Sequence, residues 1–200
     1  GLNGSGKTTL IKLLLGFLSP YEGDIYIFGK NIREWHPQAL CNIFSIVEQN
    51  KYVFTGSLRQ NIDPLKKISL KNYRNLLSQY NFNKFISRIS RNGNNLSGGE
   101  KQRIALIRSF VKNAPLYIFD EAFSSQDALS KKILINFLQN LSPEKTFIGI
   151  THQLSNNSYV DKIILIVYPK ISEICDEDNI NYGVNTEMVY KRVIKAGHDL

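Results

Sequence analysis

The chain has 200 residues, of which 42% are hydrophobic and 21% are charged, a balance typical of a globular domain with a sizeable core. Its apolar runs stop well short of the roughly 20 residues that a membrane-spanning helix needs, and its two cysteines are too few for a disulfide framework. The first residue already lies inside a motif, so we expect the chain to be a piece of a longer polypeptide.

Positive charge is concentrated in one segment. The formal net charge is +8, and residues 59–112 hold twelve lysines and arginines against only two acids, Asp63 and Glu100. A segment this basic fits contact with anionic lipid or nucleic acid. It fits a solvated helical surface equally well.

The first half of the chain is predicted to contain both helices and strands. Its apolar residues recur at helical spacing in some segments and alternate as in a strand in others. In chain order, the pattern predicts a helix over 7–18, strands over 24–28 and 43–47, a helix over 69–80 and a shorter helix over 82–89. Ser69 is the expected N-cap of the helix that follows it.

The second half alternates strands with helices. In chain order, the pattern predicts a loop over 91–95, a helix over 97–112, a strand over 116–119, a helix over 131–141, strands over 146–150 and 162–167, and an acidic loop over 173–178. Apolar strands that alternate with helices favour a parallel sheet covered on both faces. The predicted fold class is therefore α/β, with a basic helical lobe inserted into it.

The chain opens with GLNGSGKTT, which fits the phosphate-binding pattern G-x-x-x-x-G-K-[ST]. Glycines let successive backbone N–H groups converge on phosphate oxygens, and the helix that follows directs its positive end at the same anion. In this pattern Lys7 reaches the β- and γ-phosphates and the Thr8 hydroxyl binds Mg²⁺. The predicted nucleotide-binding residues of this loop are Gly1, Asn3, Gly4, Ser5, Gly6, Lys7, Thr8 and Thr9.

Two acids follow the apolar strand in LYIFDEAF. Ligands of open α/β sheets bind at the carboxyl ends of the strands, so Asp120 and Glu121 are placed where a nucleotide would lie. We predict that Asp120 helps to hold Mg²⁺ and that Glu121 polarises the attacking water as general base. Two acids can also simply mark a strand exit, but the phosphate-binding pattern upstream favours the catalytic interpretation.

Five motifs occur in a fixed order across residues 1–153: GLNGSGKTT, Gln49 in VEQNKYVF, LSGGEKQR, FDEAFSSQD, and His152 in GITHQL. This set closely resembles the nucleotide-binding domain of ATP-binding cassette (ABC) transporters. The resemblance implies ATP and Mg²⁺ as cofactors and ATP hydrolysis as the activity. It also implies a P-loop NTPase fold, with a RecA-like, mostly parallel core and a helical subdomain, whose first strands precede Gly1.

The same resemblance implies domain boundaries and further site residues. The core would comprise residues 1–51 and 113–168, the helical subdomain 52–112 and a C-terminal segment 169–200. Gln49 would contact Mg²⁺ together with Thr8 and Asp120, and would couple the nucleotide to the helical subdomain. His152 would contact the γ-phosphate and help to place the water.

In that family the LSGG turn faces the P-loop of a second, antiparallel subunit. The resemblance implies that the signature residues contact the γ-phosphate of an ATP bound across the interface, at the positive end of a helix. These residues are Leu96, Ser97, Gly98, Gly99 and Glu100. Asp127, at the end of SSQD, would belong to the loop that communicates between the two sites.

The stretch after Gln49 resembles the exporter branch of the family. Its pattern Phe-x-Gly-Thr-Ile-Arg-x-Asn-Ile is matched, with Ser57 in place of Thr, at Phe54, Gly56, Leu58, Arg59, Asn61 and Ile62. This implies an exporter with a second nucleotide-binding domain as homo- or heterodimer partner and a transmembrane domain fused upstream. It further implies no nucleic-acid partner and a location on the cytoplasmic face of the cell membrane.

Two alternatives stay open from the sequence. A soluble ABC ATPase acting on ribosomes or nucleic acid is favoured by the basic segment and by the spelling LSGGEK. It is disfavoured by SSQD, where that branch has Asn-His-Leu-Asp, and by the lack of an aromatic and basic binding platform. A nucleotide sensor without turnover is disfavoured by the intact Lys7, Asp120, Glu121 and His152.

Overall fold

The computed structural model describes residues 7–19, 22–80, 82, 88–122, 127–151, 163–167, 170–175 and 187–191. The helices are α1 (Lys7–Leu14), α2 (Pro37–Ile43), α3 (Leu58–Ile62), α4 (Leu70–Gln79), α5 (Gly98–Lys112) and α6 (Ala128–Gln139), with 3-10 turns at Ile32–Glu34 and Arg91–Gly93. The strands are β1 (Tyr26–Ile27), β2 (Lys30–Asn31), β3 (Phe44–Val47), β4 (Leu116–Asp120), β5 (Thr146–Thr151), β6 (Ile163–Val167), β7 (Lys170–Cys175) and β8 (Glu187–Lys191). Among the described residues, no helix is both long and apolar enough to cross a membrane.

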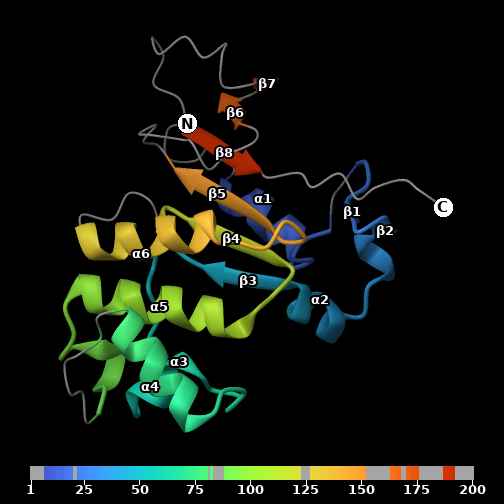
Figure 1. The fold of residues 1–200 in the computed structure, drawn as a ribbon. Helices are drawn as coiled ribbons and strands as arrows, with labels where there is room; N and C mark the ends of the chain where they lie inside the picture. The colour runs from blue at the N-terminus through green and yellow to red at the C-terminus, as the bar shows by residue number, and fades with distance from the viewer. Residues whose placement is uncertain are drawn as a thin grey trace.

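The main sheet is parallel at one end and antiparallel at the other. Its strand order is β3-β4-β5-β8-β6-β7 (Figure 1), and β3, β4 and β5 run parallel. Strand β8 is antiparallel to β5 and β6, and β7 is antiparallel to β6. Only two residues separate β6 from β7, too few for the crossover that a parallel pair requires. The predicted parallel sheet is thus confirmed for three strands, whereas β6 differs in direction.

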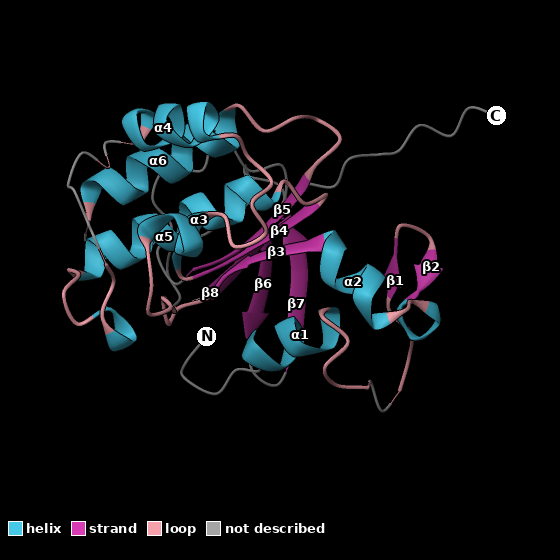
Figure 2. Cartoon of the chain, turned by 90° about the horizontal axis from the view of Figure 1, so that it is seen from below, coloured by secondary structure: helices cyan, strands magenta, loops and turns pink. Residues whose placement is uncertain are grey.

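The parallel strands are buried on both faces. In β4, Tyr117 and Phe119 join the apolar cluster that α5 and α6 cover, while Ile118 between them joins the cluster that includes Ile11 of α1. Consecutive strand residues point to opposite faces, so a continuous apolar run is what a sheet covered on both sides needs. Figure 2 shows α5 and α6 on one side of these strands and α1 and α2 on the other.

A third apolar cluster joins α3, α4 and one side of α5. Helix α5 takes part in two clusters at once, because Ile104 and Ile107 pack in this one while Leu106 and Phe110 pack against the sheet. The four side chains are at most 9% exposed. Helix α5 therefore connects the helical lobe to the sheet through direct packing.

Several predicted elements differ from the observed ones in extent. Helix α1 ends at Leu14, four residues before its predicted end, and Gly16 in the following turn has φ +72°. The predicted strand over 24–28 was wrong in length, since only Tyr26–Ile27 form a strand. They pair with Lys30–Asn31 across a turn in which Phe28 and Gly29 both have positive φ, as in a type I′ hairpin.

The predicted loops and the remaining predicted helices agree with the structure only in part. The predicted loop over 91–95 contains a 3-10 turn at Arg91–Gly93, and part of the predicted acidic loop, residues 173–175, belongs to β7. Most of the predicted helix over 82–89 lies outside the described residues. Ser69 caps α4 through its hydroxyl, and the helix over 97–112 begins and ends as predicted.

The segment that follows Gln49 is joined to α5 by a polar network centred on the buried residue Asn61. Asn61 is fully buried; its Nδ2 donates to the Phe54 carbonyl at 2.8 Å and its Oδ1 accepts from the Phe54 N–H at 2.7 Å. Arg108 of α5 donates from Nε to the Asn61 carbonyl at 2.6 Å and from Nη1 to the Tyr52 carbonyl at 2.9 Å. Two positions of the exporter-like pattern, Phe54 and Asn61, are thus joined to α5.

Replacing Asn61 by alanine leaves the partly buried N–H and C=O of Phe54 without their side-chain partner, and a buried group left unpaired costs roughly 1–3 kcal/mol. We expect Asn61→Ala to lower the free energy of unfolding by about 3 kcal/mol. Asn72→Ala, an exposed position on α4, is the matched control and should change stability by less than about 0.5 kcal/mol. Urea unfolding followed by circular dichroism measures both, and equal losses would contradict a structural role for the Asn61 network.

Candidate functional site

The predicted phosphate-binding residues are only partly within the described chain. Gly1, Asn3, Gly4, Ser5, Gly6 and His152 lie outside the described residues, as does the side chain of Lys7. Helix α1 begins at Lys7, as the phosphate-binding pattern predicts, and the side chains of Thr8 and Thr9 are exposed in its first turn. Two of the predicted nucleotide ligands are therefore accessible at the positive end of this helix.

The carboxyl ends of three parallel strands bring candidate residues to one edge of the sheet. Gln49 is exposed two residues after β3, Asp120 is the last residue of β4, and Glu121 follows it. Strand β5, which precedes His152 in the sequence, pairs in parallel with β4 up to Asp120 and Ile150. This is the edge at which open α/β sheets bind their ligands.

Glu121 has an unusual backbone conformation. Its φ is +52°, in the left-handed region, and its N–H donates to the Ile150 carbonyl of β5 at 2.8 Å. A left-handed conformation costs a residue other than glycine roughly 1–3 kcal/mol, and such residues cluster at functional sites. The hydrogen bond to β5 holds this conformation, so the direction in which the Glu121 side chain leaves the sheet is fixed.

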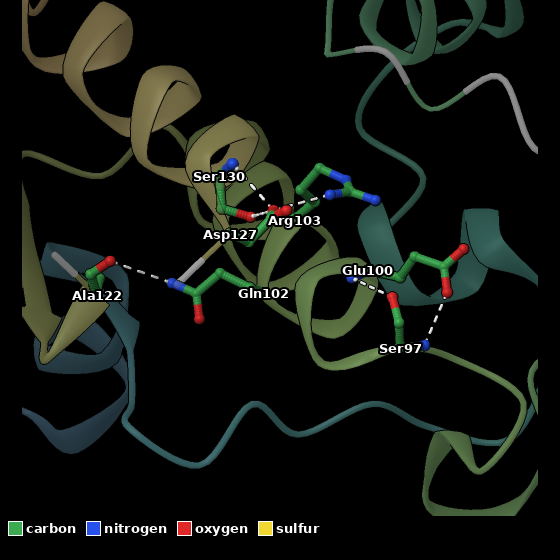
Figure 3. A network of polar contacts seen from close by, with 7 residues as sticks. All are labelled: Ser97, Glu100, Gln102, Arg103, Ala122, Asp127 and Ser130. Atoms are coloured by element: carbon green, nitrogen blue, oxygen red, sulfur yellow. Dashed lines mark hydrogen bonds and ion pairs between the residues drawn. The ribbon is translucent and has the colours of Figure 1, made fainter. Parts of the chain in front are cut away.

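The signature turn caps α5 through a reciprocal pair of hydrogen bonds (Figure 3). The Ser97 hydroxyl accepts from the Glu100 N–H at 3.2 Å, and Glu100 Oε2 accepts from the Ser97 N–H at 2.7 Å. This is a capping box. The cap uses Ser97 Oγ only as an acceptor, and a hydroxyl also has one proton to donate. Ser97 is exposed, so that proton can still reach a phosphate oxygen.

The two glycines of the signature turn have different surroundings. A Cβ built on Gly98 would meet nothing within 4 Å, whereas one on Gly99 would lie 2.9 Å from Cγ of Asp127. Among the described residues, packing therefore requires glycine at position 99 but not at position 98. The surface above Gly98 is open to another molecule.

Asp127 is the centre of a compact polar cluster. Its Oδ2 accepts from Arg103 Nη1 at 2.8 Å, from the Ser130 N–H at 3.0 Å, and through a short contact from the Ser130 hydroxyl (Figure 3). Burial raises the pKa of the Asp127 carboxyl, but the hydrogen bonds from Ser130 and the charge of Arg103 outweigh it and leave the pKa below its ordinary value. Asp127 is thus an ionised N-cap of α6 bound to the signature helix.

Gln102 links the signature helix to the residue after Glu121. Its side chain is 1% exposed, and its Nε2 donates to the Ala122 carbonyl at 3.4 Å. Within the described part of the chain its Oε1 is buried without a hydrogen-bond partner, an arrangement that costs roughly 1–3 kcal/mol. Gln102 therefore carries a free-energy cost at this position.

Sequence reasoning assigned no role to Gln102 or Arg103, although both lie in LSGGEKQR. A signal was present for Arg103, because residues four apart on a helix share a face and Gly99 precedes it by four. The contacts with Ala122 and Asp127 bridge 20 and 24 residues. No periodicity in the sequence could have predicted them.

A family model described as ABC transporter matches residues 1–124. The chain belongs to the ABC transporter family. It is 36% identical over 182 residues to an uncharacterized ABC transporter ATP-binding protein of Haemophilus influenzae, covering 86% of this chain and 32% of that protein. It is 35% identical over 176 residues to the ATP-dependent lipid A-core flippase of Francisella tularensis, covering 83% and 29%.

The fold agrees with this assignment. A solved bacterial Atm1-family ABC exporter with ATP bound matches with a TM-score of 0.78 and 28% sequence identity, covering 87% of this chain and 32% of that one. The predicted fold class and family are confirmed, and the chain is an ABC transporter ATP-binding domain homologous to those of exporters. It spans about a third of the length of these relatives. They give no support to the ribosome or nucleic-acid alternative.

The two glycines of the ABC signature provide a matched pair of substitutions. Alanine is favoured over glycine in helices by up to about 1 kcal/mol, so Gly98→Ala should raise the free energy of unfolding and yet reduce ATPase activity, because its methyl group occupies the open surface. Gly99→Ala should lower stability, since its Cβ would press on Asp127. Thermal unfolding and steady-state ATPase assays measure both effects. Full activity in Gly98→Ala would argue against close approach of a ligand there.

Proposed function

We propose that this chain is the ATP-hydrolysing domain of an ABC exporter. The observation that carries the proposal is the strained Glu121 at the carboxyl end of β4, next to Asp120 and beside the end of β5. That position suits a general base whose target is a water at the γ-phosphate of a nucleotide. The relatives support the direction of transport only by similarity, since one is named a flippase and another an exporter.

ATP would be held by residues 1–9, with the backbone of Gly1, Gly4 and Gly6 and the side chain of Lys7 on its phosphates. The described candidates fit Mg²⁺, because Thr8, Gln49 and Asp120 offer oxygen atoms, and nucleotide sites hold this ion with few protein ligands. Bound Mg²⁺ neutralises charge on the β- and γ-phosphates. The three side chains would orient it and its waters.

Hydrolysis would require a base and an orienting group. Glu121 would accept the proton of the attacking water, and the hydrogen bond from its N–H to β5 would keep its carboxylate aimed. His152, which directly follows β5 in the sequence, would contact the γ-phosphate. Asp120 would orient the metal's waters.

A second copy or a related domain would complete each site. The open surface at Gly98, the exposed Ser97 and the N-terminal end of α5 would meet ATP bound by the partner domain. ATP-driven closure of the two domains would then move the helical lobe. The network of Arg108 and Asn61, which joins α5 to the segment after Gln49, would pass that motion toward a transmembrane domain.

The full-length protein would contain a transmembrane domain as well as this ATP-binding domain. The transmembrane domain would precede this chain on the same polypeptide, as the chain's share of its relatives allows. The domain would then lie on the cytoplasmic face of the membrane. The basic segment 59–112 would face anionic lipid there.

The catalytic assignment is tested on the full-length protein with Glu121→Gln. We expect ATPase activity to fall by about 100-fold or more, while ATP still binds and holds two domains together in a stable dimer. Lys7→Ala should instead abolish tight ATP binding and closure. Steady-state ATPase assays and size-exclusion chromatography with ATP measure the two effects. A Glu121→Gln protein with wild-type turnover would remove Glu121 as the base.

The membrane assignment is tested by alkaline-carbonate fractionation of the full-length gene product in its native membrane. Retention in the pellet is expected, because spans fused to this domain resist extraction at high pH. Release into the supernatant would contradict fusion and would leave a separate membrane subunit or a soluble ABC ATPase to be tested next.

A further inference from the structure

The turn between α3 and α4 and the first half of α4 form an exposed basic surface. Residues 64–74 contain four lysines and arginines and no acid. These are Lys66, Lys67, Lys71 and Arg74, and each of the four residues is exposed. Among the described residues, none of them forms an ion pair with a carboxylate. We call residues 64–74 the basic patch, and its positive charge is not neutralised within the described part of the chain.

Two leucines lie among these cations and are also exposed. Leu65 precedes Lys66 and is 71% exposed, and Leu70 precedes Lys71 and is 59% exposed. A single exposed leucine is ordinary on a protein surface, but here each leucine is followed directly by a lysine in the same short stretch. Figure 1 shows α3 and α4 at the opposite end of the molecule from β6 and β7. The basic patch therefore offers apolar and cationic side chains together, on the helical lobe.

The backbone of the turn keeps Leu65 exposed. The buried carboxylate of Asp63 accepts hydrogen bonds from the Lys67 N–H at 2.8 Å and from the Ile68 N–H at 3.1 Å. Lys66 has φ +52°, in the left-handed region that residues other than glycine seldom adopt. Because these bonds fix the backbone from Asp63 to Ile68, the exposure of Leu65 belongs to the shape of the turn. A surface that is already ordered loses little conformational entropy when it binds a partner.

We propose that the basic patch binds a membrane surface that contains anionic lipid, with its cations on lipid phosphates and with Leu65 and Leu70 inserted between the headgroups. This rests on the proposed function, which places the domain on the cytoplasmic face of a membrane, and it narrows the contact from segment 59–112 to residues 64–74. A lipid surface suits the patch because it presents phosphates and apolar chains at every position, so cations and leucines need no matching groove. Each lysine at an anionic surface strengthens binding about fivefold.

The test measures lysine acetylation in the full-length protein, reconstituted in nanodiscs of phosphatidylcholine with or without phosphatidylglycerol. Neither lipid carries a primary amine, so an acetylating ester modifies only the protein, and mass spectrometry reads each lysine separately. We expect Lys66, Lys67 and Lys71 to react at least about fivefold more slowly when phosphatidylglycerol is present. This protection should disappear at about 1 M salt, where screening shortens the Debye length to about 3 Å.

Lysines and leucines outside the basic patch supply the controls. Lys12 of α1 and Lys132 of α6 are exposed, and each should react at the same rate in both kinds of nanodisc. Replacing both leucines of the patch, Leu65→Ser together with Leu70→Ser, should reduce the protection of the patch lysines while leaving the charge unchanged. Leu18→Ser makes the same change at another exposed leucine, after α1, and should leave the protection at the wild-type level. Exposed positions change stability little, so thermal unfolding should be similar for all these proteins.

Equal reaction of the patch lysines with and without phosphatidylglycerol would overturn the proposal, and so would unchanged protection in the double serine variant. Patch lysines that react slowly in both kinds of nanodisc, compared with Lys12, would show that a polypeptide covers the patch instead of lipid. Failure of the proposed function gives a different result, namely release by alkaline carbonate or full ATPase activity in Lys7→Ala. A protein that stays in the pellet and hydrolyses ATP, but whose patch lysines react equally in both nanodiscs, would overturn the lipid contact alone.

Discussion

The double burial of α5 is the constraint on which the rest of the described structure depends. One 15-residue helix supplies Leu106 and Phe110 to the cluster on the sheet and Ile104 and Ile107 to the helical lobe. A helix packed on two sides cannot shift against one layer without disturbing the other, because protein interiors are close-packed. Motion at its N-terminal end must therefore be shared by the sheet edge and the lobe.

Polar contacts along α5 also reach both the helical lobe and the sheet side. Toward the lobe, Arg108 binds the segment after Gln49 through the backbone carbonyls of Asn61 and Tyr52. Toward the sheet, Gln102 and Arg103 bind the connection that follows Glu121. Hydrogen bonds are directional and costly to leave unmade, so these contacts restrain the position of α5 in addition to its apolar packing.

Much of the fold was predictable from local chemistry. The apolar run 116–119 indicated a strand covered on both faces, and Ser97 followed by Glu100 is a capping box that starts a helix. The direction of β6 was not predictable, since it depends on the pairing partner that a two-residue connection to β7 selects. The hairpin at Phe28 and Gly29 was missed because two-residue strands have too few positions to show a period.

The sequence by itself determined the family, the order of its motifs and the residue types that a nucleotide site needs, because phosphate binding demands glycine, lysine and acid at fixed short spacings. Only the tertiary structure decided why Gly99 is glycine, since the reason is the Asp127 carboxylate 28 residues downstream. It also decided the left-handed conformation of Glu121, which the Ile150 carbonyl of a neighbouring strand holds. Contacts between distant residues leave no local pattern, so they become visible only when the chain has folded.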